Sequence, residues 1–212
     1  MRSRSDVLEL AILGLLAETP MHGYELRKRL NLLLGSFRAL SYGSLYPALK
    51  TLAERHLIVG VDGPQTPPPH ALSGKRARIV YQLTAEGKEH LGEMLANAGP
   101  SSWEDEHFGV RFALFSQTDA ETRLRILEGR RTRLTERLEQ VRQSATRTRE
   151  RMDAYTLELQ RHGLEQVERE VKWLDGLIDN ERGAWRRAED VGSGRSTGSD
   201  TADGATRRSA DI

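Results

Sequence analysis

The sequence predicts a mainly α-helical protein whose front half contains a two-stranded β-hairpin, and three observations lead to this fold class. Apolar residues recur at helical spacing over residues 7–55 and again over 103–187. Two β-branched runs of strand length, HLIVGV and RIVYQL, lie between these helical segments. A chain of 212 residues with a hydrophobic fraction of 37% can form one mid-sized domain or two small ones around a modest core.

Two helices are expected first. The earlier one covers residues 7–17, where apolar residues face one side, and Pro20 follows its end. After a short turn, a second helix should run from Met21 to about Leu33, with the basic run at 27–29 mostly facing solvent. Both helices therefore present an apolar face to a shared core.

The stretch YGSLYPALKTL, residues 42–52, predicts a third helix that contains a proline. Its three leucines recur at helical spacing and should face the core. Proline is tolerated in the first turn of a helix, because the N–H group that it lacks would have no partner there. With Ser44 as the N-cap, Pro47 would be the third helical residue, whereas a start at Ser41 implies a kink.

The runs at 56–61 and 78–83 should pair as a hairpin with a long, proline-rich tip. A fourth helix follows, with Thr84 as its N-cap, and runs to about Asn97. Three short helices followed by a hairpin with a basic tip are typical of a winged helix-turn-helix. In that fold the third helix enters the major groove of DNA, and the wing touches the backbone or the minor groove.

Charge and helix polarity agree with a nucleic-acid partner. Residues 1–83 carry 11 Lys+Arg against 6 Asp+Glu, although the whole chain has a net charge of only +1. The positively polarised start of the third helix suits a groove lined by phosphates. Tyr24 is either a DNA contact or a residue that packs the second helix on the third. The candidate DNA contacts are Tyr24, Ser44, Tyr46, Pro47, Lys50, Lys75, Arg76 and Arg78.

Beyond AGPSS the composition shifts to helix-forming residues. A long helix is expected from 119 to about 161, with two heptad rows that polar residues interrupt, and Gly163 should break it before a last helix over 164–187. Such coiled-coil rows predict homodimerisation, because two-fold protein symmetry matches palindromic DNA sites. The candidate dimerisation residues are Leu127, Leu134, Leu138, Val141, Val171, Leu174 and Ile178.

Aromatic residues gather just after the AGPSS boundary. They are either part of a helical core or the lining of a pocket for a small aromatic or hydrophobic effector. The residues concerned are Trp103, Phe108, Phe112 and Phe115.

Several function classes are not expected. The chain has no cysteine, and its six histidines show no spacing of three or four residues, so neither a metal site nor another cofactor is predicted. No nucleophile and base are placed together in a recognisable catalytic pattern, which argues against an enzyme. Neither a signal peptide nor a membrane span is recognised, and we therefore expect a cytoplasmic protein.

Three segments carry a family resemblance: MHGYELRKRL, YGSLYPALKTLAERHLI and RIVYQLTAEGKEHL. They resemble the segments that mark the PadR family of bacterial transcriptional regulators, over residues 7–97. Helices 103–187 resemble, more loosely, the dimerisation domain of its longer subfamily. The resemblance places the recognition-helix signature on Gly43, Ser44, Leu45, Tyr46, Pro47 and Leu49, and a wing tyrosine on Tyr81. The proline-rich wing tip is longer than the family's usual basic turn.

The sequence thus favours a winged helix-turn-helix DNA-binding domain over residues 1–99, a coiled-coil-like helical dimerisation domain over 100–188 and a disordered tail over 189–212. The function expected is that of a homodimeric regulator, a repressor at a palindromic operator, with release by a small-molecule effector. The alternative is an adaptor whose C-terminal helices bind another protein while the winged domain serves as scaffold.

Overall fold

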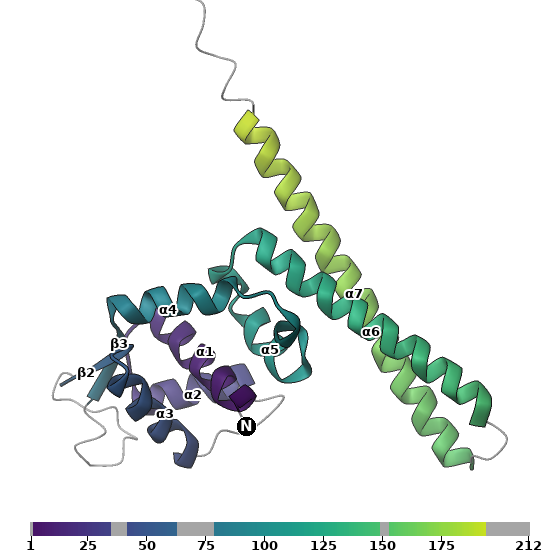
Figure 1. The fold of residues 1–212 in the computed structure, drawn as a ribbon, viewed down its shortest axis with the longest axis horizontal. Helices are drawn as coiled ribbons and strands as arrows, with labels where there is room; N and C mark the ends of the chain where they lie inside the picture. The colour runs from purple at the N-terminus through teal and green to yellow at the C-terminus, as the bar shows by residue number, and fades with distance from the viewer. Residues whose placement is uncertain (1, 35–41, 63–78, 149–152, 194–212) are drawn as a thin grey trace, which may run out of the picture.

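The computed structural model describes residues 2–34, 42–62, 79–148 and 153–193, and it confirms the mainly helical fold class (Figure 1). The tail from residue 194 onward lies outside the described residues. The elements are α1 (Arg2–Glu18), β1 (Met21–His22), α2 (Gly23–Leu34), α3 (Tyr42–Glu54), β2 (Ile58–Asp62), β3 (Ile79–Leu83), α4 (Ala85–Ala96), the 3-10 turn η2 (Pro100–Trp103), α5 (Asp105–Ala113), the 3-10 turn η3 (Phe115–Gln117), α6 (Ala120–Thr148) and α7 (Ala154–Ser193).

Helix α1 is the centre of the N-terminal core. Residues 10–16 are almost fully buried because α1 contacts α2, α3, α4, α5 and β3. The leucines predicted to face inward from α3, Leu45, Leu49 and Leu52, are buried against it, which confirms that part of the prediction. Val110 and Leu114 belong to the same cluster, so the segment after the fourth helix is packed directly onto the winged part.

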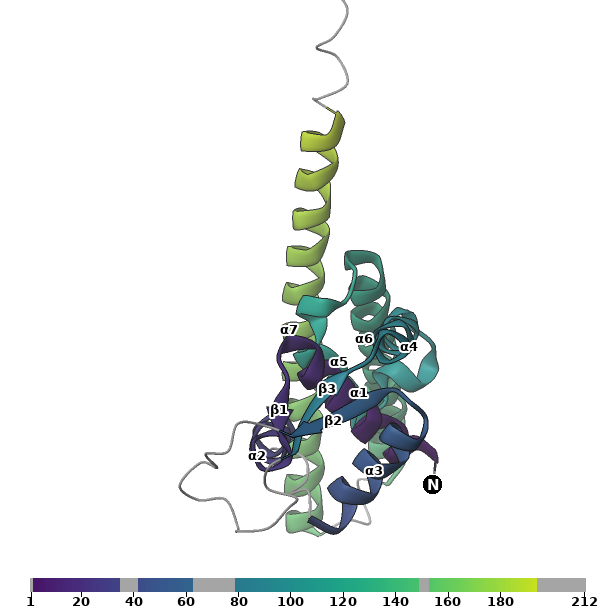
Figure 2. The same ribbon diagram turned by 90° about the vertical axis from the view of Figure 1, so that its left-hand side faces the viewer.

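The sheet has one more strand than the predicted hairpin. Strands β2 and β3 pair antiparallel from Ile58↔Leu83 to Asp62↔Ile79, as expected for a wing. Met21, predicted to begin the second helix, instead lies in β1 and pairs with Tyr81 of β3. The strand order is therefore β1-β3-β2, and Figure 2 shows the three strands beside α2. A strand of two residues is too short to show a period of two, which is why the sequence did not indicate it.

Helix α3 begins at Tyr42, before the N-cap position proposed for Ser44. Pro47 is thus the sixth helical residue and lies inside the helix rather than in its first turn. It cannot donate a hydrogen bond to the carbonyl group of residue 43, so the first turn of α3 is held less firmly than the rest. The exposed hydroxyl group of Thr51 donates to the carbonyl oxygen of Pro47 at 3.1 Å.

The fourth helix agrees with its prediction and is anchored at its start. Thr84 is the N-cap of α4, and its hydroxyl oxygen accepts from the N–H of Gly87 at 2.9 Å. The same hydroxyl group donates to the carbonyl oxygen of His56 at 2.7 Å. One side chain therefore ties the beginning of α4 to the loop between α3 and β2.

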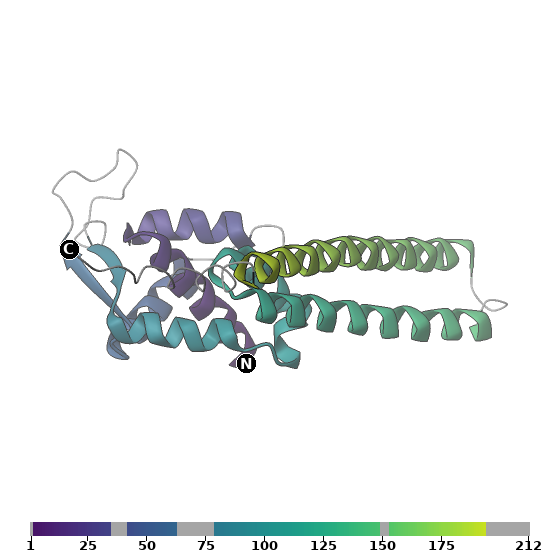
Figure 3. The same ribbon diagram turned by 90° about the horizontal axis from the view of Figure 1, so that it is seen from above.

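Helices α6 and α7 form an antiparallel pair, and Figure 3 shows them side by side along most of their length. The expected break at Gly163 is wrong, because Gly163 lies within α7 and the chain reverses before Asp153. Asp153 caps the new helix by accepting from the N–H groups of Tyr155 at 2.9 Å and Thr156 at 3.0 Å. No described helix has an apolar stretch long enough to cross a membrane.

Replacing Gly163 with alanine should stabilise the protein. A Cβ at this exposed position would meet nothing within 4 Å, and alanine restricts the unfolded chain more than glycine does. We expect Gly163→Ala to raise the free energy of unfolding by about 0.5–1 kcal/mol, measured by urea titration. A decrease in the free energy of unfolding would indicate that α7 is interrupted at Gly163.

Candidate nucleic-acid interface

Helix α3 has one buried and one exposed face. Its leucines lie in the core, whereas Ser44, Pro47 and Lys50 are exposed. The Nζ atom of Lys50 lies 3.6 Å from Oε1 of Glu54, but both side chains are more than 60% exposed. Such an exposed ion pair contributes little, so Lys50 can exchange Glu54 for a phosphate at small cost.

Tyr46 does not share this exposed face as the sequence suggested. It is half-buried and packs against the N-terminal core. A Cβ built on Gly23 would lie 3.6 Å from the Tyr46 hydroxyl oxygen and 3.5 Å from the ring of Tyr81. The two tyrosines from α3 and β3 therefore meet at the first residue of α2, where an added Cβ would make ordinary van der Waals contact with both side chains.

Helix α2 supplies a second basic surface. Tyr24 is 39% exposed, so it is not simply a packing residue between α2 and α3. Together with Arg27, Lys28, Asn31 and Leu32 it lines a surface hollow of about 330 Å³. An aromatic ring beside cationic side chains can contact both the sugars and the phosphates of a nucleic-acid backbone.

The wing lies next to α3. Figure 1 shows both at the end of the molecule that is farthest from the α6–α7 pair. Val59 and Val61 on β2 are 41% and 44% exposed, so the outer strand offers an open surface. The predicted wing contacts Lys75, Arg76 and Arg78 lie outside the described residues.

The end of α3 is fixed by a polar cluster that the sequence did not reveal. Oε2 of Glu9 on α1 accepts from Arg55 at 2.7 Å, and its Oε1 lies 2.7 Å from Nε2 of His90 on α4. Glu9, Arg55 and His90 thus join three helices at one point. Residues so far apart in the chain give no sequence signal that they meet.

The candidate dimerisation residues are used mainly within one chain. Leu127, Leu134, Leu138, Leu174 and Ile178 are at most 8% exposed. All but Leu138 belong to the core cluster between α5, α6 and α7. Val141 and Val171 are half-buried. These five side chains are therefore buried within a single chain, whereas the heptad pattern predicted that they form a dimer interface.

The aromatic cluster also packs internally. The rings of Phe112 and Phe115 have centroids 5.1 Å apart, and Trp173 of α7 packs against both Phe108 and Phe112. Trp103 lies over Gly129, where an added Cβ would come within 2.4 Å of its ring. These contacts fill the space between α5, α6 and α7, as a core would. Among the described residues, no group of three His, Asp or Glu side chains could hold a metal ion.

The fold and the exposed surface of α3 define a winged helix-turn-helix protein. The Transcriptional regulator PadR-like family model matches residues 12–93, which span α1 to α4. By this match, the winged part of the chain belongs to this family of DNA-binding transcriptional regulators, a family of regulators rather than of enzymes.

Several solved structures match the chain with TM-scores below 0.5. The crystal structure of Bacillus subtilis PadR in complex with operator DNA is 22% identical, with 82% of this chain and 99% of that chain covered and a TM-score of 0.38. A transcriptional regulator from Thermoplasma acidophilum is 33% identical over 44% of this chain and 79% of its own, with a TM-score of 0.36. The Vibrio cholerae virulence activator AphA is 20% identical over 87% and 99%, with a TM-score of 0.34. No curated protein matches the chain.

Proposed function

We propose that this protein is a homodimer that binds a palindromic operator and represses transcription. Residues 1–99 would form the DNA-binding domain and 100–188 the dimerisation domain. The observation that carries the proposal is the two-sided α3, whose leucine face is buried while Ser44, Pro47 and Lys50 are exposed beside the wing. In winged helix-turn-helix proteins this helix enters the major groove.

Dimerisation is supported by a separate surface on α7. Tyr155 and Leu159 are 89% and 71% exposed, and Trp173 is 45% exposed. Eighteen residues separate Tyr155 from Trp173, which is about five helical turns, so all three side chains lie along one stripe. We call these three residues the α7 stripe. Large apolar side chains aligned on one face of a helix favour a protein partner, and a second copy presents the same stripe.

Titration of operator DNA across salt concentrations tests DNA recognition. A regulator should bind with steep salt dependence from counterion release and should prefer its operator to random DNA by several kcal/mol. For an adaptor that uses the winged part only as scaffold, DNA binding would depend neither on salt concentration nor on DNA sequence. Equal affinity for both DNAs at every salt concentration would therefore contradict the proposal.

The variant Lys50→Ala tests the placement of α3. Lys50 is exposed on α3, so the fold should survive while operator binding weakens. Each lysine removed from a phosphate should lower the slope of log K against log salt by about 0.9. Lys88→Ala is the matched control, because Lys88 is exposed on α4, which lies away from α3 in Figures 1 and 2. Unchanged binding by Lys50→Ala would show that the exposed face of α3 does not face the groove.

Control by a small-molecule effector completes the proposal. A ligand that binds the DNA-free conformation better than the DNA-bound one would release the operator, by an amount set by its differential affinity. Addition of candidate compounds to a preformed protein–DNA complex measures this release directly.

A further inference from the structure

Helix α3 is held most rigidly where it ends. His56 follows the helix with a φ of 58°, a left-handed conformation that is uncommon outside glycine. This turn lets the N–H of Leu57 donate to the carbonyl oxygen of Leu52 at 3.0 Å. The N–H of His56 donates in the same way to the carbonyl oxygen of Ala53 at 3.0 Å. Near the beginning of α3, by contrast, Pro47 leaves the helix with one hydrogen bond fewer.

A single carboxylate ties the end of α3 to two other helices. Oε2 of Glu9 accepts from Nη1 of Arg55, the residue after α3, and Oε1 of Glu9 lies 2.7 Å from Nε2 of His90. A carboxylate can only accept hydrogen bonds, so Nε2 of His90 carries the hydrogen. Nε2 then has no lone pair for Nη2 of Arg55, which lies 3.4 Å away. Arg55 and His90 are therefore joined through Glu9 rather than to each other, and we call these three residues the Glu9 cluster.

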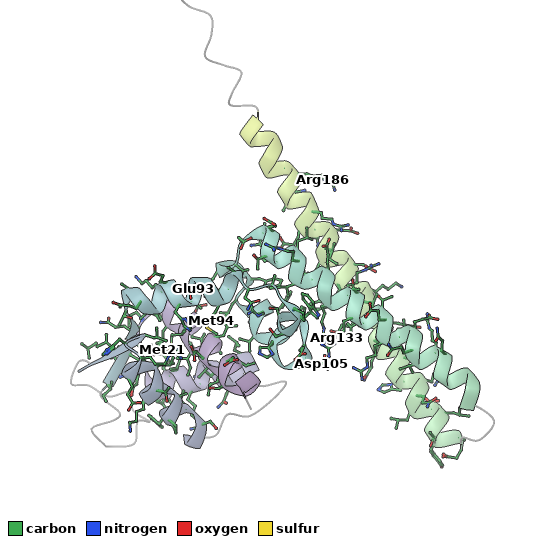
Figure 4. All side chains as sticks on the ribbon, in the orientation of Figure 1. Met21, Glu93, Met94, Asp105, Arg133 and Arg186 are labelled. Atoms are coloured by element: carbon green, nitrogen blue, oxygen red, sulfur yellow. The ribbon has the colours of Figure 1, made fainter. Side chains whose placement is uncertain are left out.

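The Glu9 cluster is better suited to orient α3 than to stabilise the fold. Glu9 is 16% exposed but Arg55 is 43% exposed, and a partly exposed ion pair adds little to stability. The leucines of α3 already bury its inner face, but apolar contacts are non-directional, whereas hydrogen bonds restrict rotation and sliding. The other charged neighbour of His90 is Glu93 on α4 (Figure 4), which is 76% exposed and 3.9 Å from Nδ1, so it does not reach α3 as Glu9 does.

A small rotation at the end of α3 would be amplified at its beginning. The helix has 13 residues and is about 20 Å long. A tilt of about 5° around its C-terminal end therefore moves its N-terminal end by about 1.7 Å. Hydrogen bonds to base edges would be lost by such a displacement, because they need narrow ranges of distance and angle. Phosphate contacts from long exposed side chains such as Lys50 can follow the displacement.

We propose that Glu9 is a positioning residue that sets how well α3 discriminates between DNA sequences, without itself touching DNA. By holding Arg55 and His90, it fixes the angle at which α3 lies on the winged core, and with it the register of the exposed face in the major groove. This inference rests on the proposed function, because it concerns how α3 reads a groove. Loss of Glu9 should reduce the preference for one sequence and leave the affinity for DNA in general.

Glu9→Gln tests this role with a side chain of the same size. The amide offers one acceptor oxygen and a donor NH2 group, so it can accept from Arg55 or from His90 but not from both. The probes are a duplex that the unaltered protein selects from a random-sequence pool and a shuffled duplex of the same length. In fluorescence anisotropy, the affinity for the selected duplex should fall by about tenfold or more, and the affinity for the shuffled duplex should change by less than about twofold.

Glu18→Gln is the matched control. Glu18 is also on α1 and also pairs with an arginine, but that residue is Arg29, at 3.4 Å, and the pair joins α1 to α2 instead of α3. Both variants lose one negative charge, so any general effect of charge on DNA affinity is shared, and Glu18→Gln should keep its sequence preference. His90→Gln should keep it as well, because its amide N–H still donates to Glu9, whereas His90→Leu should lose part of it.

The ratio of the two affinities separates a positioning role from a structural one. Partial unfolding of Glu9→Gln would lower both affinities by the same factor, whereas a displaced α3 lowers only the affinity for the selected duplex. Hydrogen exchange without DNA measures the anchoring, and amides of residues 51–57 should exchange faster in Glu9→Gln than in Glu18→Gln.

The inference is overturned if Glu9→Gln keeps its sequence preference, loses both affinities equally, or exchanges hydrogen as Glu18→Gln does. An unaltered protein that selects no duplex from the pool would contradict the proposed function, and this inference with it. The exchange measurement tells the two failures apart, because it reports without DNA whether Glu9 anchors the end of α3.

Discussion

Gly87→Ala should destabilise the protein by more than about 3 kcal/mol, because the added methyl group has no room. A Cβ at Gly87 would lie 1.9 Å from the Leu57 carbonyl oxygen and 2.9 Å from its carbon. These are backbone atoms, and they cannot rotate away as the end of a side chain can. The Leu57 carbonyl oxygen is also held in place by the N–H of Thr84 at 3.2 Å. Urea unfolding followed by circular dichroism measures the loss.

Gly92→Ala is the matched control on the same helix. A Cβ at Gly92 would meet nothing within 4 Å, so alanine should raise stability by about 0.5–1 kcal/mol through better helix propensity. If the two alanine variants, five residues apart, change the free energy of unfolding in opposite directions, the constraint lies at the contact between α4 and Leu57. If Gly87→Ala unfolded at the same urea concentration as Gly92→Ala, the close approach of these segments would be disproved.

The constraint at Gly87 also affects the DNA-binding surface. The loop at Leu57 connects α3 to β2, and Thr84 follows β3 directly. A shift of α4 away from Leu57 would therefore move the base of the wing relative to α3. Operator affinity should fall along with stability in Gly87→Ala, because groove contacts depend on the relative position of these two elements.

Local patterns predicted the winged part well because its elements are short and strongly patterned. The leucine spacing in α3 and the threonine cap of α4 are signals contained within a few residues. The start of α3 does not follow from the sequence, since Ser41 and Ser44 are equally good caps by residue type, and the helix begins at Tyr42. Tyr46 was misplaced because its contact with Gly23 joins residues that are distant in the chain.

The heptad rows were recognised, but a periodic apolar face does not identify its partner. Arg131 interrupts one predicted row, and in the structure it pairs with Asp175 of α7. Ion pairs between Arg123 and Glu181 and between Arg142 and Glu168 follow the same antiparallel order. The seam therefore closes within one chain. A seam between two chains would show the same sequence spacing. Only the start of a new, antiparallel helix capped by Asp153 distinguishes a seam within one chain from a seam between two chains.

The burial of Arg111 could not have been predicted. An arginine in an amphipathic helix is usually exposed, and nothing in residues 103–117 indicates that this one is buried while Arg133 is half-exposed. Among the described residues, its Nε and Nη1 atoms have no hydrogen-bond partner, which is a property of the packed structure.

Replacing Tyr155 and Leu159 with glutamate should convert a dimer into a monomer. Both side chains are exposed in the single chain, so the change should leave the fold intact, unlike changes to the buried leucines of α6. Two like-charged stripes would repel each other and lose their apolar contact. Figure 4 labels Arg186 on the part of α7 that extends past the start of α6, so α7 offers a partner more surface than its own chain covers.

Loss of the dimer should lower operator affinity by about 10²–10⁴-fold, because two linked domains bind adjacent half-sites with a high effective concentration. Sedimentation velocity gives the oligomeric state, and fluorescence anisotropy with operator DNA gives the affinity. Lys172→Glu on the same helix changes the charge equally at an exposed position off the stripe, and it should remain dimeric. A double variant that stayed dimeric would place the interface away from the α7 stripe. A monomeric variant with unchanged operator affinity would instead show that one winged domain is enough for binding. The two half-sites, about 34 Å apart in a palindromic operator, would then not have to be bound by two linked domains.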